Sequence, residues 1–167
     1  EKELVMDRER ELWKTVNRTE GYDGREAFSK HPGDTVGAVA IDRSGNVCVG
    51  TSTGGTLNKY PGRVGDSPLI GCGSYAENGI GGVSTTGWGE GMIKTVLAKT
   101  VMDRMEANGG DAQKAAEHGI DLLKRKVDGR GGVIVLNREG RVGLAFSTPR
   151  MARAYITAGM RTPVFEV

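Results

Sequence analysis

Threonine residues at the ends of apolar strands are the groups in this sequence best suited to chemistry. Thr35 opens one apolar strand, and Thr53 ends the strand that we expect to return antiparallel to it, so Thr53 should lie close to Thr35. Thr85 and Thr86 end another apolar strand, just before a predicted helix. Threonine favours strands in any case. Hydroxyls from several strand ends at one edge of a sheet nevertheless favour a catalytic interpretation.

A charged pair in a nearby loop adds to this hypothesis. Arg63 and Asp66 belong to the segment Pro61-Gly-Arg-Val-Gly-Asp. Alone they are typical of a solvated loop pair. Beside the threonines, they would suit the carboxylate and the ammonium group of a free amino acid.

The abundance of glycine, 27 residues in all, raises the alternative of nucleotide binding. Gly87-Trp-Gly-Glu-Gly precedes a helix, but its third glycine comes one residue too early for the dinucleotide motif. The sequence also lacks the Gly-Lys-Ser/Thr of a P-loop. We therefore interpret these glycines as places where the backbone approaches a small ligand or exposes N–H groups at a helix start.

Composition excludes several other classes of protein. The 167 residues suit one domain or most of one, and 23 basic against 21 acidic residues predict no affinity for nucleic acid or anionic lipid. No apolar run reaches the 20 residues that span a bilayer. Two histidines argue against a histidine metal site or a Ser-His-Asp triad, and Cys48 and Cys72 are expected to be buried free thiols. No secretory signal is visible, so we expect a cytoplasmic location, with a periplasmic or lysosomal location as the alternatives.

Two similar hairpins dominate the predicted elements. An apolar strand over residues 35–42 and a second over 47–53 flank a turn, and both are expected to be buried on both faces. Residues 132–148 align with residues 37–53 without gaps, sharing the pattern Arg-x-Gly-x-Val and a terminal Ser-Thr. This repeat predicts a single pseudo-repeated antiparallel sheet.

Helical periodicity appears upstream of and between the hairpins. Apolar spacing predicts helices over residues 2–17, 90–107 and 111–126, the last capped by Asp111. Residues 18–34 have the composition of a linker. Together these elements predict a layered α+β fold.

Four segments of the chain resemble one known family. They are Asp34-Thr-Val-Gly-Ala-Val-Ala-Ile-Asp, Gly50-Thr-Ser-Thr-Gly-Gly, Asn58-Lys-Tyr-Pro-Gly-Arg-Val-Gly-Asp-Ser-Pro-Leu-Ile-Gly and Ser84-Thr-Thr-Gly-Trp-Gly-Glu. In their order and spacing they resemble the plant-type asparaginases and isoaspartyl peptidases, N-terminal nucleophile hydrolases that include the glycosylasparaginases. The resemblance covers residues 34–167, whereas residues 1–33 match no motif of the family that we can place.

The resemblance implies a self-processing threonine hydrolase. Thr35 would become the nucleophile when the precursor cleaves itself between Asp34 and Thr35. Its new α-amino group would act as general base, because an α-amine titrates near pH 7.7–8.0, about the operating pH. The remaining roles implied are orientation of the nucleophile by Thr53, an oxyanion hole from the Thr86 hydroxyl and the Gly87 N–H, and substrate binding by Arg63, Asp66, Thr86, Gly87 and Gly89.

The resemblance also implies an architecture and an assembly. The family fold is a four-layer αββα sandwich, of which this chain would supply mainly the C-terminal, β-subunit half. Residues 1–34 would end the α-subunit and residues 35–167 would form the β-subunit. The expected partners are a small substrate, the upstream α-subunit half and a second copy in a dimer of αβ heterodimers. We expect no cofactor, no metal in the site, no nucleic acid and no membrane.

The favoured activity is hydrolysis of L-asparagine and β-aspartyl dipeptides through an aspartyl-Thr35 ester. A glycosylasparaginase is the alternative within the family, since the Arg63 and Asp66 pair suits both. Trp88 stands where many members have a small or polar residue and would narrow the leaving-group side. An alternative of another class is a non-catalytic amino-acid-binding fragment, because without its upstream half the sheet would have an edge that seeks a partner.

Overall fold

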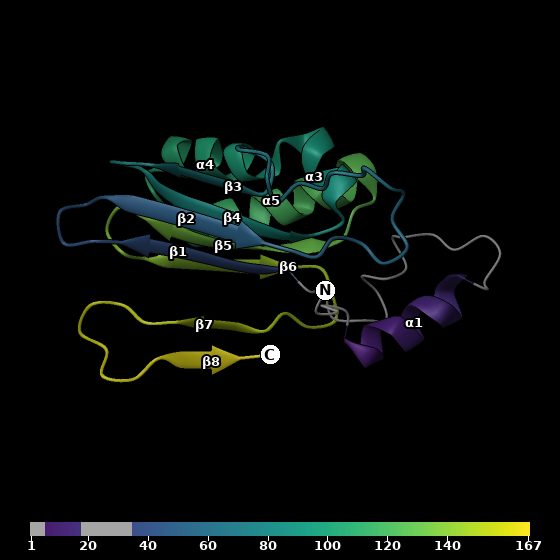
Figure 1. The fold of residues 1–167 in the computed structure, drawn as a ribbon. Helices are drawn as coiled ribbons and strands as arrows, with labels where there is room; N and C mark the ends of the chain where they lie inside the picture. The colour runs from purple at the N-terminus through teal and green to yellow at the C-terminus, as the bar shows by residue number, and fades with distance from the viewer. Residues whose placement is uncertain (1–5, 18–34) are drawn as a thin grey trace.

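The structure is a computed structural model that describes residues 6–17 and 35–167. Its elements are α1 (Asp7–Asn17), β1 (Val36–Ile41), β2 (Val47–Ser52), β3 (Ser74–Glu77), β4 (Gly81–Gly87), α3 (Gly89–Thr95), α4 (Leu97–Ala107), α5 (Ala112–Val127), β5 (Gly131–Asn137), β6 (Val142–Phe146), β7 (Arg153–Tyr155) and β8 (Val164–Glu166). The mixture of helices and antiparallel strands is the predicted α+β class (Figure 1). The helix expected over residues 2–17 begins at Asp7 among the described residues, and the predicted linker lies outside them.

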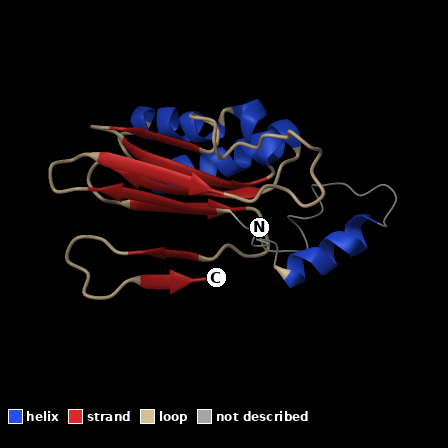
Figure 2. Cartoon of the chain, viewed as in Figure 1, coloured by secondary structure: helices blue, strands red, loops and turns tan. Residues whose placement is uncertain are grey.

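A four-stranded antiparallel sheet in the order β3-β4-β5-β6 forms the centre of the molecule. Helices α3, α4 and α5 pack on one of its faces (Figure 2). The core between them consists of aliphatic and methionine side chains that are almost fully buried, among them Val83, Leu97, Val101, Met105, Leu123, Val133 and Val135. On the strands these residues recur every two positions, and on the helices every three or four positions. This periodicity explains why the apolar pattern of the sequence predicted these elements.

The hairpin of β1 and β2 forms a separate sheet that stacks on the other face of the central sheet. A Cβ on Gly82 would lie 2.5 Å from Val39 Cγ1, and one on Gly37 would lie 2.1 Å from Ser84 Oγ. The absence of side chains at these two glycines therefore lets the sheets approach closely. Both predicted hairpins form, but the prediction of one pseudo-repeated sheet was wrong, because the repeats face each other instead of pairing edge to edge.

The outer face of the β1–β2 hairpin is exposed. Alternate residues of β2 are half-buried and exposed, and Val36 in β1 is 67% exposed. The prediction that these strands are buried on both faces was therefore wrong for the described residues, because nothing among them covers this side. Cys48 lies on that face and is exposed, which corrects its predicted burial, whereas Cys72 is buried as expected; both thiols are free.

The helix predicted over residues 90–107 is broken into α3 and α4. Val96 adopts the left-handed conformation with φ of 45°, which is unfavourable for a β-branched residue. The break lets the N–H groups of Ala98 and Lys99, at the start of α4, donate to the carbonyl groups of Cys72 and Gly71. The apolar stripe cannot reveal this break, since it depends on a loop far away in the sequence.

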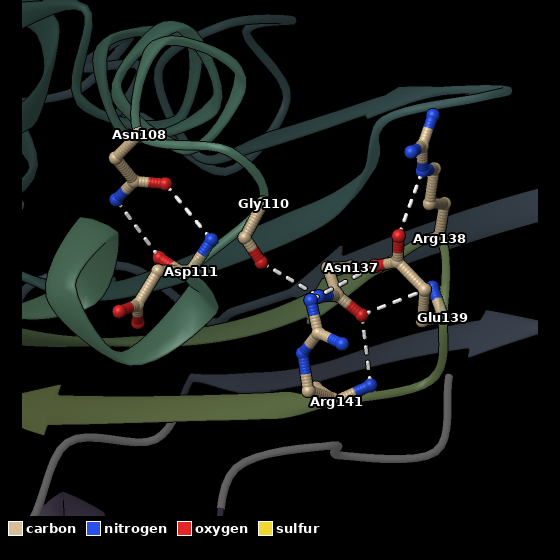
Figure 3. Close-up of polar contacts among 7 residues, drawn as sticks. All are labelled: Asn108, Gly110, Asp111, Asn137, Arg138, Glu139 and Arg141. Atoms are coloured by element: carbon tan, nitrogen blue, oxygen red, sulfur yellow. Dashed lines mark hydrogen bonds and ion pairs between the residues drawn. The ribbon is translucent and has the colours of Figure 1, made fainter.

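A fully buried asparagine, Asn137, forms hydrogen bonds that link the turn between β5 and β6 to the turn before α5 (Figure 3). Asn137 Nδ2 donates to the Gly110 carbonyl over 2.6 Å, and its Oδ1 accepts from the N–H groups of Glu139 and Arg141 at 3.0 and 2.8 Å. Asp111 caps α5 by accepting from Lys114 N–H, as the sequence predicted. These contacts fix the second hairpin against the helical layer.

The C-terminal strands β7 and β8 form a further two-stranded sheet. Arg153 in β7 pairs with Glu166 in β8 at 2.7 Å, and its guanidinium lies 5.0 Å from the centre of the Phe146 ring in β6. In the described part of the chain, no helix is long and apolar enough to cross a membrane.

Candidate active site

The hairpin brings Thr35 and Thr53 into contact. Val36 pairs with Ser52 in the β1–β2 register, so the residues just beyond them lie opposite each other. The Thr35 Oγ1–H donates to Thr53 Oγ1 over 3.1 Å, and the Gly55 N–H donates to the same Thr53 oxygen over 3.0 Å. The predicted closeness of Thr53 to Thr35 is therefore confirmed. Asp34, the other half of the expected cleavage site, lies outside the described residues.

The stacking of the two sheets carries β1 toward the end of β4. Val39 lies against Gly82 and Gly37 against Ser84, so β1 and β4 run past each other in opposite directions. The next pair in this register is Thr35 and Thr86. Ser84 Oγ also lies 2.8 Å from Thr51 Oγ1, which ties β2 to the same strand. Because alternate strand residues share a face, Thr86 points to the same side as Ser84.

Gly87 ends β4 with a conformation that only glycine adopts readily. Its φ is 136°, and a Cβ there would lie 2.4 Å from the Arg130 carbonyl oxygen. This geometry turns the chain from the strand into α3 within two residues. Two neighbouring positions, the Thr86 side chain and the Gly87 backbone, are thus held at the end of a strand that is otherwise buried.

Arg63 and Asp66 converge on the backbone of Gly89 at the start of α3. A Cβ on Gly89 would lie 2.8 Å from Asp66 Oδ1 and 2.9 Å from Arg63 Nη2. Arg63, Asp66 and Gly89, three of the five residues to which the resemblance gives a role in substrate binding, are therefore close neighbours. The side chains present a carboxylate and a guanidinium there, which is the combination needed for an amino acid's ammonium and carboxylate groups.

Asp66 is only 6% exposed, and its Oδ2 accepts from Thr85 Oγ1 at 3.2 Å. Burial raises the pKa of Asp66 above its ordinary value, while the hydrogen bond from Thr85 and the charge of Arg63 oppose the rise. Thr85 and Thr86 therefore serve opposite faces of β4: the first contacts Asp66, and the second faces the hairpin that carries Thr35.

Sequence reasoning missed the partner of Arg63. Arg63 Nε and Nη2 donate to the two carboxylate oxygens of Glu90, at 2.8 and 3.0 Å. This bidentate pair lowers the pKa of Glu90 and raises that of Arg63. The signal available was a glutamate next to Gly89 in the Gly-Trp-Gly-Glu segment, but a first-turn helix glutamate is ordinarily explained by the helix dipole.

Within the described ranges, no three histidine, cysteine or acidic side chains gather as metal ligands would. The polar groups of the site are instead hydroxyls, one guanidinium, carboxylates and backbone N–H groups. Such a set suits hydrogen-bonded recognition and nucleophilic attack by a hydroxyl.

Comparisons with known proteins point to one family. A family model described as Asparaginase matches residues 1–166, which includes the segment in which the sequence alone showed no motif. The chain is 46% identical over 143 residues to a probable isoaspartyl peptidase/L-asparaginase of Drosophila melanogaster, covering 85% of this chain and 43% of that protein.

Two further relatives come from a vertebrate and a bacterium. An isoaspartyl peptidase/L-asparaginase of Xenopus laevis is 49% identical over 122 residues, covering 73% of this chain and 39% of that protein. An isoaspartyl peptidase of Escherichia coli (strain K12) is 43% identical over 138 residues, covering 83% of this chain and 43% of that protein. The chain thus spans about two fifths of the length of these curated relatives.

Proposed function

The chain belongs to the asparaginase family whose model it matches, and from this premise we propose that the complete protein is an amidohydrolase of L-asparagine and β-aspartyl dipeptides. Relatives named isoaspartyl peptidase/L-asparaginase support this substrate class. The observation that carries the proposal is the hydrogen bond from Thr35 Oγ1 to Thr53 Oγ1 at 3.1 Å, at the position where the family motif begins.

The nucleophile is produced by hydrolysis of the peptide bond between Asp34 and Thr35. Water is consumed, Asp34 gains a carboxylate and Thr35 gains an α-amino group. That amine lies on the same residue as the attacking hydroxyl and titrates near pH 7.7–8.0, so it can accept the hydroxyl proton at about neutral pH. General-base catalysis by this amine requires no histidine.

Catalysis then proceeds in two transfers. Thr35 Oγ attacks the side-chain amide carbon of the substrate, and its proton passes to the α-amine. The Thr86 hydroxyl and the Gly87 N–H stabilise the oxyanion, each such donor being worth roughly 2.7–4 kcal/mol. The C–N bond breaks, the amine leaves with a proton, and an aspartyl ester of Thr35 remains. Water hydrolyses this ester and releases aspartate.

Substrate orientation comes from Arg63 and Asp66. Arg63 binds the α-carboxylate and Asp66 the α-ammonium. Gly89 has no side chain to fill the space between them, where a Cβ would lie 2.9 Å from Arg63 Nη2 and 2.8 Å from Asp66 Oδ1. Both charges of the amino acid are then fixed before attack, which aligns the amide carbon with Thr35. This pairing favours substrates with a free α-amino acid group.

The same proposal includes the larger architecture. The exposed outer face of β1–β2 is compatible with a fourth, helical layer in an αββα sandwich, of which residues 35–167 are the β-subunit part and residues 1–34 the end of the α-subunit. Assembly as a dimer of αβ heterodimers and a cytoplasmic location complete the proposal.

The test is the intact mass of the complete protein after incubation near neutral pH, with Thr35→Ala as control. Two fragments that separate between Asp34 and Thr35 in the wild type, and an uncut Thr35→Ala chain, are expected. An uncut wild type that circular dichroism shows to be folded would refute the threonine mechanism and favour a non-catalytic amino-acid-binding protein.

Substrate choice is tested with the cleaved protein. Release of aspartate from L-asparagine, β-aspartyl dipeptides and glycosylated asparagine is compared at equal concentration. Preference for the first two supports the proposal. Preference for glycosylated asparagine would instead identify a glycosylasparaginase, which the Arg63 and Asp66 pair would serve equally well.

A further inference from the structure

Glu90 occupies one edge of the Arg63 guanidinium, and no other described residue accepts a hydrogen bond from that group. A guanidinium has five N–H donors in one plane. Glu90 uses the one on Nε and one on Nη2, over 2.8 and 3.0 Å. The second donor on Nη2 and the adjacent donor on Nη1 form another edge, here called the open edge, which matches a carboxylate in a bidentate manner.

The open edge lies between two glycines. A Cβ on Gly65 would lie 2.7 Å from Arg63 Nη1, and one on Gly89 would lie 2.9 Å from Nη2. Any larger residue at these positions would push the guanidinium aside. Asp66 Oδ1 lies 2.8 Å from the same Gly89 Cβ position. The open edge of Arg63 therefore lies next to the carboxylate that would bind the ammonium group.

The Arg63 side chain is only 16% exposed, and Glu90 is the one described residue that accepts hydrogen bonds from its guanidinium. Arg63 belongs to an irregular loop in which its neighbour Val64 is 57% exposed and Tyr60 is 87% exposed. Glu90, by contrast, lies in the first turn of α3, whose Gly89 and Met92 are buried. The pair thus joins a loop residue to a fixed helix.

We propose that Glu90 is a positioning residue, which holds Arg63 by its Nε edge so that the Nη edge is ready for the α-carboxylate of the substrate. This inference rests on the proposed function. An unrestrained arginine side chain would lose rotamer freedom on each binding event, whereas the paired one has already lost it. Glu90 therefore lowers KM without touching the substrate.

The charge of Glu90 acts in the opposite sense, because it repels the substrate carboxylate across the guanidinium. The Glu90 side chain is 42% exposed, so water screens this repulsion, and the Arg63 charge lies between the two carboxylates. Loss of the hold on Arg63 is therefore the larger effect when Glu90 is removed.

The experiment uses the complete, self-cleaved protein and the variants Glu90→Ala, Glu90→Gln and Glu106→Ala. Glu106 is an exposed glutamate of the α4 helix and controls for the loss of one negative charge. Ammonia release is measured for L-asparagine and for a derivative whose α-carboxylate is blocked as the methylamide. The derivative yields ammonia only from its side chain and lacks the group that Arg63 would bind.

The expected result for Glu90→Ala with L-asparagine is a KM about tenfold higher, with kcat within threefold of the wild type. Glu90→Gln keeps one acceptor oxygen and should restore KM to within about threefold. Glu106→Ala should change nothing. The kcat/KM for the blocked derivative should be the same in all variants, whereas a merely structural role of Glu90 would lower it too.

A double variant completes the test. In an Arg63→Ala background, adding Glu90→Ala should not raise KM further, because the group that Glu90 positions is gone; removal of the now unpaired Glu90 charge should instead lower KM slightly. An active wild type whose KM for L-asparagine is unchanged by Glu90→Ala would overturn this inference alone. A folded, cleaved wild type that hydrolyses none of the substrates would overturn the proposed function, and this inference with it.

Discussion

Substitution of Gly89 by alanine tests the proposed substrate site with the smallest possible change. The added Cβ would lie 2.8 Å from Asp66 Oδ1, 2.9 Å from Arg63 Nη2 and 3.1 Å from the Asp66 backbone nitrogen. Ordinary contacts of a Cβ are 3.4–4 Å. Both charged groups must therefore retreat by roughly half an ångström or more, in directions that separate them from a shared ligand.

The cost to binding should exceed the cost to folding. The Arg63 contact is with the far end of a long side chain, which can move, whereas Asp66 is buried and its backbone nitrogen lies 3.1 Å from the new Cβ. We expect the free energy of unfolding to fall by about 1–2 kcal/mol. Misplacing charge-assisted bonds worth about 1.5–3 kcal/mol each should lower kcat/KM for L-asparagine by roughly 10- to 100-fold, mostly through KM.

The assay is ammonia release from L-asparagine, with the intact mass used to verify cleavage before Thr35. Glu106→Ala is the control, since Glu106 is an exposed residue of α4 with no proposed role in the site. A folded and cleaved Gly89→Ala protein whose kcat/KM stays within threefold of the wild type would refute the assignment of Arg63 and Asp66 to the substrate.

Four other variants test the remaining arguments. Thr53→Val removes the acceptor of the Thr35 hydroxyl and should lower kcat for L-asparagine by about 100-fold with little change in KM. A comparable rise in KM would contradict the role of Thr53 in orienting the nucleophile. Asn137→Ala leaves buried partners unsatisfied and should lower the free energy of unfolding in urea by about 3 kcal/mol; a loss below 1 kcal/mol would contradict this. Asp66→Asn should stabilise the protein increasingly as the pH rises from about 4, because burial raises the pKa of Asp66 in the folded protein. The wild type then loses stability as the pH rises from the unfolded-state pKa to the folded-state pKa, and the variant does not. A difference in unfolding free energy that does not change with pH would refute this. Val96→Gly relieves the positive φ and should add about 0.5–1 kcal/mol to the unfolding free energy, whereas a loss would show that the contacts of the Val96 side chain matter more.

Local signals predicted the elements that depend on neighbours in the sequence. The turn pattern Arg-x-Gly-x-Val and the flanking apolar runs gave both hairpins, because a strand period of two and a tight turn are written within about 17 residues. The α5 helix was predicted from its helical spacing of apolar residues, and its cap from the aspartate Asp111 that precedes it. The closeness of Thr35 and Thr53 followed from antiparallel pairing alone.

Predictions failed where the answer depended on distant contacts. The two hairpins carry the same pattern, and that pattern does not distinguish pairing in one sheet from stacking of two. The break at Val96 depends on carbonyl groups of Gly71 and Cys72, about 25 residues earlier. The exposure of Cys48 depends on what covers the outer face of β2, which an alternating strand does not specify.

The site shows the same division. By itself the sequence indicated which residues could act, since Thr35, Thr53, Thr86, Arg63 and Asp66 lie in segments that resemble one family, and that resemblance implies a threonine nucleophile and an amino-acid site. Only the tertiary structure decided that Glu90, 27 residues away, holds Arg63, and that Gly89 lies between Arg63 and Asp66. The physical reason is that hydrogen-bond partners and close approaches are fixed by the packing of a loop on a helix, and packing depends on distances that no spacing along the chain records.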